Sequence, residues 1–149
     1  MLFRSDIDGG LLIGVRRKAE PGFSYWRVTP WIMPCFTQVP PRADHPIHGH
    51  FWVPIDDENC WAWSFDYHPT RPLREQEVTA MKNGAGIHCK YVPGTYIPLA
   101  NKSNDYLMDR EKQRSGELYS GIQGIAIQDS SLQESMGPIQ DRSREHLTK

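Results

Sequence analysis

Asp129 is the side chain whose position most directly suggests chemistry. At helical spacing, the apolar residues Ile122, Ile125, Leu132 and Met136 fall on one stripe and predict one face of a helix. Asp129 lies in the middle of this stripe. A carboxylate on a buried helix face is unfavourable unless a partner neutralises its charge, and a metal cation is one such partner. The spacing therefore makes Asp129 a candidate metal ligand.

A second interpretation of Asp129 follows from the residues after it. Ser131, with Glu134 three positions later, fits a capping box that would start the helix beyond Asp129. Asp129 would then be a cap or loop residue, and the pattern alone favours this interpretation over a ligand. In both interpretations Gly137-Pro138 ends the helix, because glycine accepts the left-handed cap conformation and proline cannot continue the turn.

The loop Asp44–His50 contains a second candidate metal site. His48 and His50 have the His-x-His spacing found in cupins, but Pro54 and Ile55 stand where a cupin would place its glutamate. A metal site requires a full set of converging ligands. We therefore interpret both histidines as loop or strand-edge residues.

The N-terminal half carries the strand signals that would position these groups. Leu11–Arg17 and Phe23–Met33 are rich in β-branched and aromatic residues, and a short turn joins them, which predicts a hairpin. A second pair is predicted at His50–Ile55 and Cys60–Phe65, with a turn over Asp56–Asn59.

Alternation in the second of these strands places its aromatic residues together. Trp61, Trp63 and Phe65 occupy every other position, so they share one face of the sheet. This face could be part of a core or the wall of an aromatic-binding pocket. We favour the core for any single residue, because apolar strand residues usually pack inside.

The C-terminal half carries helix signals. Arg74–Lys82 predicts a short surface helix, Gly84–Ala100 a long loop, and Asn104–Arg114 a second helix before the Asp129 segment. Asp141–His146 is a charged surface segment. Strands first and helices last predict an α+β fold, a twisted antiparallel sheet packed by C-terminal helices.

Length and charge limit the classes of function. A chain of 149 residues is long enough for one domain with a core. Its net charge of −1 gives no reason to expect a nucleic-acid or anionic-membrane partner, and no apolar run approaches the ~20 residues of a membrane span. The start lacks the apolar stretch of a secretory signal, and three widely spaced cysteines favour free thiols in a reducing cytoplasm.

Several motifs of the chain resemble one enzyme family. Gln128-Asp129, then ESMGPI, DR and EHL over residues 134–147, resembles the C-terminal catalytic region of Rieske non-haem iron aromatic-ring-hydroxylating oxygenase large (α) subunits, within them the phthalate dioxygenase-like group. NKSNDYLMDR at Asn101–Arg110 and VPIDD at Val53–Asp57 support this resemblance, which extends from about Gly10 to the last residue.

The resemblance implies a site and a fold. It implies that Asp129 completes a 2-His-1-carboxylate Fe(II) site, and we expect Gln128 to orient that carboxylate. Trp61, Trp63, Ile125 and Leu132 are our expected pocket-lining residues. The implied fold is of the helix-grip kind.

The resemblance also implies that residues 1–149 are the C-terminal part of a catalytic domain. The Asp-x-x-His…His segment and the paired Cys-x-His and Cys-x-x-His motifs of a Rieske cluster do not occur in this sequence. The remaining iron ligands and the 2Fe–2S cluster would then belong to a longer protein. We therefore expect this chain alone to be inactive and to bind iron weakly.

For the full-length protein, the resemblance implies O2-dependent hydroxylation or O-demethylation of an aromatic compound. Its partners would be the aromatic substrate, O2, a reductase or ferredoxin, and further α subunits in a homo-oligomer. Two other functions stay open from the residues: a metal-free helix-grip module that binds an apolar or aromatic ligand, and a cupin-like protein that uses His48 and His50.

Overall fold

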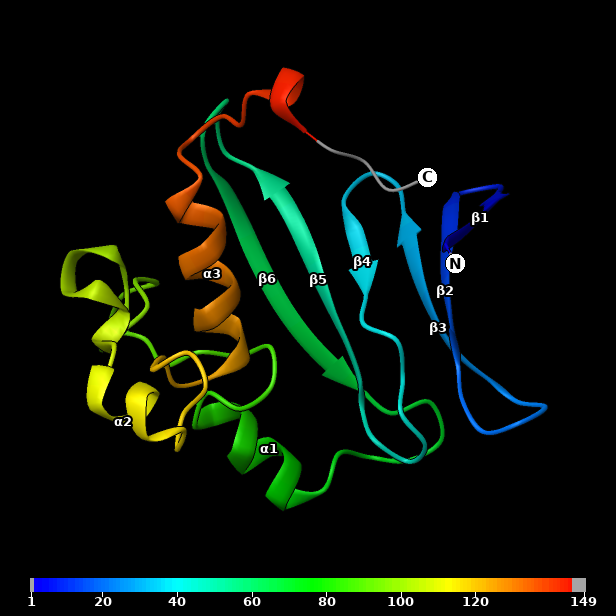
Figure 1. Cartoon of the computed structure of the whole chain (residues 1–149), viewed down its shortest axis with the longest axis horizontal. Coiled ribbons are helices and arrows are strands. Elements are labelled where there is room, and N and C mark those ends of the chain that lie inside the picture. The colour runs from blue at the N-terminus through cyan, green and yellow to red at the C-terminus, as the bar shows by residue number, and fades with distance from the viewer. Residues whose placement is uncertain (1, 146–149) are drawn as a thin grey trace. The chain divides into compact units, whose positions relative to one another are not determined.

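The computed structural model describes residues 2–145 of the 149-residue chain. The chain divides into two compact units, one ending at Arg74 and the other beginning at Glu75. In the described residues the first unit holds the named strands and the second holds the helices, as the labels in Figure 1 show. The α+β fold expected from strands first and helices last is therefore confirmed. None of the helices within residues 2–145 is long and apolar enough to cross a membrane.

The first unit is an open six-stranded antiparallel sheet in which every strand pairs with its neighbour in the chain. Its strands are β1 (Leu2–Ile7), β2 (Gly10–Lys18), β3 (Ser24–Ile32), β4 (Phe36–Gln38), β5 (Ile47–Pro54) and β6 (Cys60–Tyr67). This order needs no crossover connection, so short turns and loops suffice to build the sheet.

Both predicted strand pairs are present. In the β2–β3 turn Gly22 has a positive φ of 84°, and the Phe23 amide donates to the Glu20 carbonyl at 2.9 Å. In the β5–β6 turn the Asp56 carboxylate accepts the backbone amides of Glu58 and Asn59, which holds the pKa of Asp56 below its usual value. Turn residues of this kind fix the register of the strands that they join.

The sheet has two strands that the sequence did not predict, and one strand begins earlier than predicted. The edge strand β1 and the three-residue strand β4 were not predicted, and β5 begins at Ile47, inside the predicted loop. β1 is exposed along its whole length and β4 is very short, so neither has the long apolar alternation on which strand prediction rests.

The second unit is mostly loops and short helices. Its helical elements are α1 (Glu75–Lys82), the 3-10 turn η1 (Lys102–Leu107), α2 (Arg110–Ser115), α3 (Ile125–Ser135) and the 3-10 turn η2 (Arg142–Arg144). The predicted surface helix is α1, and the predicted long loop contains one isolated bridge, between Tyr91 and Pro98. His146 and Leu147, the end of the C-terminal motif, lie outside the described residues.

The helix predicted over Asn104–Arg114 is confirmed from Arg110 onward and is wrong for the residues before it. Asp105, Tyr106 and Leu107 have φ of 51°, 56° and 51°, which no right-handed helix accepts. A new helix, α2, starts after Asp109, whose side chain accepts the backbone amides of Glu111 and Lys112 at 3.0 Å each. The apparent single helix is therefore a strained turn followed by a separately capped helix.

The helix that carries Asp129 starts earlier than the capping-box interpretation required. The N-cap of α3 is Gly124, with φ 88°, so Asp129 lies inside the helix. The Ser131 hydroxyl donates to the Gln128 carbonyl within the helix, which contradicts its predicted role as a cap. The predicted end is confirmed, since Gly137 has φ 89° directly after the last turn.

Candidate functional site

Asp129 lies on the exposed face of α3, in the middle of apolar side chains. Ile125, Leu132 and Met136 lie close to its direction around the helix and are 59%, 66% and 58% exposed. The prediction that this stripe is the buried face is therefore wrong for these three residues, whereas Ile122, which precedes α3, is buried. The pattern grouped these residues correctly, but spacing alone does not tell which side of a helix is covered.

The covered face of α3 is the opposite one. Ile127 is buried with Ile122 and Tyr106, and these three residues form the core of the second unit. The Tyr106 hydroxyl donates to Glu134 Oε2 at 2.5 Å. Burial, and then the bonded carboxylate of Glu134, raises the pKa of Tyr106 to about 12, so its phenol is a neutral donor at ordinary pH.

Gln128 supports the entry into α3. Its Nε2 donates to the Ile122 carbonyl at 2.9 Å, across the turn that precedes the helix. The structure thus gives this amide nitrogen a partner other than Asp129, and the orienting role expected for Gln128 stays a prediction. A cavity of about 520 Å³ in the same unit is lined by Gln128, Ser131 and Leu132, among others. Leu132, an expected pocket residue, therefore borders both this cavity and the face that carries Asp129.

The aromatic residues of β6 share one face of the sheet, as the alternation predicted. Trp61 and Trp63 have ring centroids 5.9 Å apart and are 41% and 50% exposed. The preferred core interpretation is wrong for these two tryptophans within the described residues. Their expected role as pocket walls stays a prediction.

The same sheet face continues across β4 and β5. Phe36, Phe51 and Phe65 contact one another with centroid separations of 5.1 to 5.3 Å. A Cβ on Gly49 would lie 2.3 Å from Cζ of Phe65, so glycine is what lets this ring lie across β5. The first unit therefore presents a continuous, partly exposed aromatic surface.

The other face of the sheet holds the histidines of the candidate cupin-like site. His48 Nδ1 contacts the buried carboxylate of Asp66, and His50 Nδ1 lies 3.2 Å from the Ser64 hydroxyl. Each histidine pairs with the residue directly opposite it in the β5–β6 register. Both belong to β5, which pairs with β4 on one side and β6 on the other, so their interpretation as loop or strand-edge residues is wrong.

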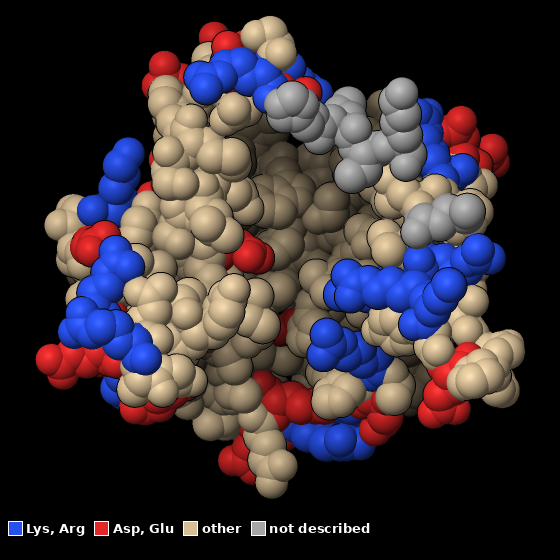
Figure 2. All heavy atoms as spheres, in the orientation of Figure 1, with Lys and Arg blue, Asp and Glu red and all other residues tan. Residues whose placement is uncertain are grey.

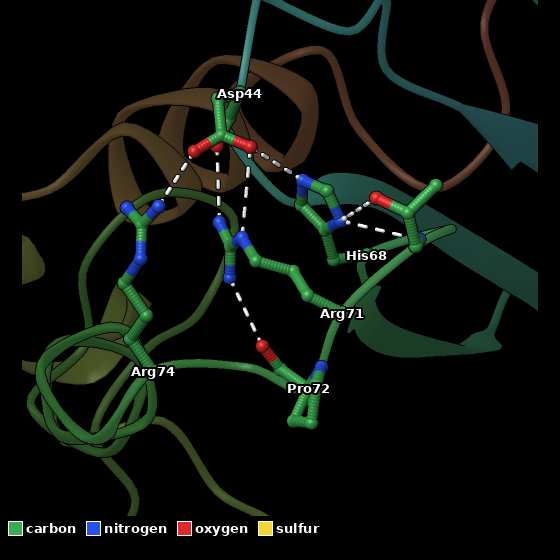
Figure 3. Close-up of polar contacts among 6 residues, drawn as sticks. Asp44, His68, Arg71, Pro72 and Arg74 are labelled. Carbon is green, nitrogen blue, oxygen red and sulfur yellow. Dashed lines mark hydrogen bonds and ion pairs between the residues drawn. The ribbon is translucent and has the colours of Figure 1, made fainter.

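A cluster that the sequence analysis missed lies after β6. The Asp44 carboxylate forms hydrogen bonds with Arg74 Nη2 at 2.6 Å and with His68 Nε2 at 3.0 Å (Figure 3). Arg71 donates a hydrogen bond to the backbone carbonyl of Asp44 at 3.0 Å. The hydrogen bond from Arg74, ahead of the other basic groups, holds the pKa of Asp44 below its usual value. We name these four residues the Asp44 clasp.

The Asp44 clasp ties the connection before β5 to the segment after β6. A cavity of about 440 Å³ beside it is lined by residues that include Asp44, His45 and His68. A signal for the clasp was present in the sequence, because His68, Arg71 and Arg74 are three residues apart in a proline-rich segment. Proline-rich segments favour polyproline II, which has three residues per turn and places such residues on one side.

The donor set for a metal is incomplete within the described residues. Nowhere in residues 2–145 do three His, Cys, Asp or Glu side chains converge to hold a metal ion. Asp129 offers one exposed carboxylate, which suits an iron site only if the other ligands come from elsewhere.

Figure 2 shows that acidic and basic side chains both occur on the visible face, between large uncharged areas.

Comparison with known proteins adds a family relationship. A family model described as "LigXa C-terminal domain like" matches residues 15–149. The chain is 34% identical over 143 residues to a 3-chlorobenzoate-3,4-dioxygenase oxygenase subunit of Comamonas testosteroni, covering 87% of this chain and 32% of that protein. It is 30% identical over 123 residues to a phthalate 4,5-dioxygenase oxygenase subunit of Pseudomonas putida, covering 83% of this chain and 27% of that protein. The chain therefore matches about a third or less of the length of these relatives.

Proposed function

The chain belongs to the LigXa C-terminal domain-like family of Rieske oxygenase large subunits, and from this premise we propose that it is the C-terminal part of the catalytic domain of an enzyme that hydroxylates or O-demethylates an aromatic compound. Both relatives are named as oxygenase subunits of dioxygenases that act on aromatic acids. The proposed substrate class of this chain follows theirs.

The observation that carries the proposal is the setting of Asp129 on α3. Its carboxylate lies among Ile125, Leu132 and Met136 on a face that the second unit leaves exposed. An apolar patch of this kind marks a surface that another part of a protein or a ligand covers. Once covered, the carboxylate would need a cation or a donor to offset its lost hydration.

In the proposed enzyme, Asp129 is one of three protein ligands of a mononuclear Fe(II), and the two histidines belong to the longer protein. Bound there, Fe(II) would supply the chemistry of O2 activation, with electrons from a 2Fe–2S cluster of the longer protein. The part played by Asp129 is to offset some of the metal charge and to hold one position of the coordination sphere. Gln128 fixes the loop before α3 through Ile122 and would act on Asp129 through the helix backbone.

The aromatic surface of the sheet supports the remaining parts of the proposal. Trp61 and Trp63 on β6, with Ile125 and Leu132 on α3, are the proposed walls of an aromatic-binding pocket. Each unit presents an exposed apolar face, as expected of a helix-grip fold, which we propose as the finer form of this α+β chain. A reductase or ferredoxin, a homo-oligomer of α subunits and a cytoplasmic location complete the proposal.

Removing the Asp129 carboxylate tests the proposal. In the full-length enzyme we expect Asp129→Ala to abolish bound iron and turnover together, while the matched variant Gln133→Ala, exposed on the same helix, leaves both unchanged. Iron is measured by metal analysis and turnover by O2 consumption with an aromatic acid. Retention of iron and turnover in Asp129→Ala would contradict the assignment.

The other two functions have less support. The family relationship does not favour a metal-free binding module. A cupin-like site would need His48 and His50 as ligands, yet both side chains bond to residues of β6. For the isolated 149-residue chain we expect weak Fe(II) binding, and tight stoichiometric binding would contradict this expectation.

A further inference from the structure

The turn before α2 has an unusual backbone. Asp105, Tyr106 and Leu107 are three consecutive residues in the left-handed region, and none of them is glycine. An L-residue in this region brings its Cβ close to the following carbonyl oxygen, so each one is strained. A run of three such residues persists only where surrounding contacts determine it, and such outliers concentrate at functional sites.

The side chains of Asn101 and Asn104 close the turn by accepting hydrogen bonds from backbone amides. The Asn101 side chain accepts the Ser103 amide at 2.9 Å, and the Asn104 side chain accepts the Asn101 amide at 2.9 Å. The Tyr106 amide donates to the Asn101 carbonyl at 2.9 Å, and Asn104 Nδ2 donates to the Leu99 carbonyl at 2.8 Å. Main-chain and side-chain hydrogen bonds thus hold the strained residues against the start of the turn at Asn101.

The turn directs Tyr106 onto α3 at two points. Its ring packs in the core with Ile122 and Ile127, where Tyr106 is only 9% exposed. Its hydroxyl reaches Glu134 Oε2 at 2.5 Å. Ile127 and Glu134 are two helical turns apart along one side of α3, so one side chain fixes both the position and the rotation of the helix.

The rotation of α3 decides where Asp129 points. At about 100° per residue, Ile127 and Glu134 lie roughly 160° and 140° around the helix from Asp129. Contact of one side with Tyr106 therefore presents the other side, with Ile125, Asp129 and Leu132, outward. We propose that Tyr106, acting through its hydrogen bond to Glu134, is a positioning residue that sets the direction of the Asp129 carboxylate. This inference rests on the proposed role of Asp129 as an iron ligand.

The hydroxyl of Tyr106 and its acceptor can be separated from the rest of the contact. Tyr106→Phe removes the donor and keeps the buried ring, whereas Glu134→Leu removes the acceptor. Glu134→Gln keeps an acceptor oxygen at the same place, so it is the conservative variant that should rescue function. Tyr119→Phe, on a fully accessible tyrosine in the same unit, is the matched control.

In the full-length enzyme we expect Tyr106→Phe and Glu134→Leu each to weaken Fe(II) affinity about tenfold to a hundredfold, the range typical for groups that orient metal ligands. Combining the two changes should weaken affinity no further, since both remove the same bond. Glu134→Gln and Tyr119→Phe should stay within about threefold of the unmodified enzyme. Affinity is measured on folded protein, with the helix content checked by circular dichroism, so a mere loss of folded material does not imitate the effect.

The same variants have a readout in the 149-residue chain that needs no iron. The ultraviolet difference between the unmodified chain and Tyr106→Phe should show one phenol that ionises at a pKa of about 12. Glu134→Leu should lower this pKa by removing the acceptor and its charge. An unchanged pKa in Glu134→Leu would contradict the hydrogen bond itself.

The outcomes separate this inference from the proposed function. If Asp129→Ala loses iron while Tyr106→Phe and Glu134→Leu keep normal affinity, positioning by Tyr106 is wrong and the ligand assignment stands. If Asp129→Ala keeps its iron, the proposed function is wrong, and the inference is overturned with it. If Tyr106→Phe fails to fold, the pair Glu134→Leu and Glu134→Gln decides, because equal affinities in these two would overturn the proposal.

Discussion

In the unit that ends at Arg74, each strand pairs with its neighbour in the chain, and long ladders such as the one between β2 and β3 spread stability over many backbone bonds. In the unit that begins at Glu75, the described residues contain one helix longer than eight residues, α3, and a core of only three buried side chains. The structure of the sheet therefore rests on many repeated strand pairings, whereas that of the helical unit rests on a few individual side-chain contacts.

This difference explains where the candidate chemistry lies. A sheet built from repeated pairings tolerates local changes on its faces, because neighbouring rungs keep the register. A helix held by Tyr106 and Ile127 depends on each contact, but those same contacts fix the direction of Asp129. Asp129, whose proposed role depends on the direction of its side chain, thus lies in the unit in which single contacts fix the orientation of a helix.

The comparison implies that the sheet is most sensitive where two backbones approach closely. A Cβ on Gly10 would lie 2.0 Å from the Trp31 carbonyl oxygen, a backbone atom that cannot move without parting β2 from β3. We expect Gly10→Ala to lower the free energy of unfolding of the first unit by about 3 kcal/mol, the upper part of the usual range for overpacking. Fluorescence is the appropriate measurement, because all five tryptophans lie in this unit.

Gly9→Ala is the control for this change. A Cβ on Gly9 meets only a side-chain atom of Ile32 at 4.0 Å, so we expect its unfolding midpoint in urea to stay close to that of the unmodified chain. Equal midpoints for the two variants would mean that the sheet can adapt at β2. The contrast between a rigid ladder and a contact-dependent unit would then be lost.

A second prediction concerns the two faces of α3. Ile127 is buried, so Ile127→Ala should lower the free energy of unfolding of the second unit by about 3 kcal/mol, within the range for buried isoleucines. Ile125→Ala removes the same atoms from a side chain that is more than half exposed, and we expect a loss of less than about 1 kcal/mol. Circular dichroism at 222 nm during urea unfolding measures both. The reverse order would mean that the side of α3 with Ile125, Leu132 and Met136 is the buried one.

The sequence was a better guide to the sheet than to the helical unit, for a physical reason. Alternation and turn residues are local, so β2–β3 and β5–β6 could be predicted from their own residues. The left-handed run at Asp105–Leu107 could not be predicted from its own residues, since it is held by contacts with Asn101 and, through Tyr106, with α3. The buried side of α3 could not be predicted either, because Tyr106 reaches it from a distant part of the chain.

The candidate site was predicted in part, and by two different routes. The stripe grouped Asp129 with Ile125, Leu132 and Met136, which do share one side of α3, although that side is exposed. The assignment of Asp129 as an iron ligand came from the resemblance of its motif to a family, and the family itself is confirmed. The Asp44 clasp was missed because the three-residue spacing groups only its basic residues, and nothing in the sequence links them to Asp44, 24 to 30 positions away.

The smallest expected effect is at the Asp44 clasp, which joins loops of the first unit and in which both Asp44 and its nearest partner, Arg74, are exposed. Asp44→Asn should lower the unfolding midpoint of the sheet by less than Gly10→Ala does, because exposed ion pairs are screened by water and salt. The pKa of Asp44 is held low, chiefly by Arg74, so the ionised carboxylate contributes stability above its usual pKa. This contribution disappears as the pH falls through the lowered pKa, when Asp44 takes up a proton.

Tryptophan fluorescence during urea unfolding at neutral and at acid pH measures this effect. We expect the difference between the unmodified chain and Asp44→Asn to be largest at low salt near neutral pH and to vanish in acid. Asp6→Asn, which breaks the isolated Arg4–Asp6 pair on β1, should show a smaller difference at every pH, because a single exposed pair is not supported by a network. If both variants behave alike, the three basic groups around Asp44 do not act together, and the loops of the first unit are held by the β-ladders alone.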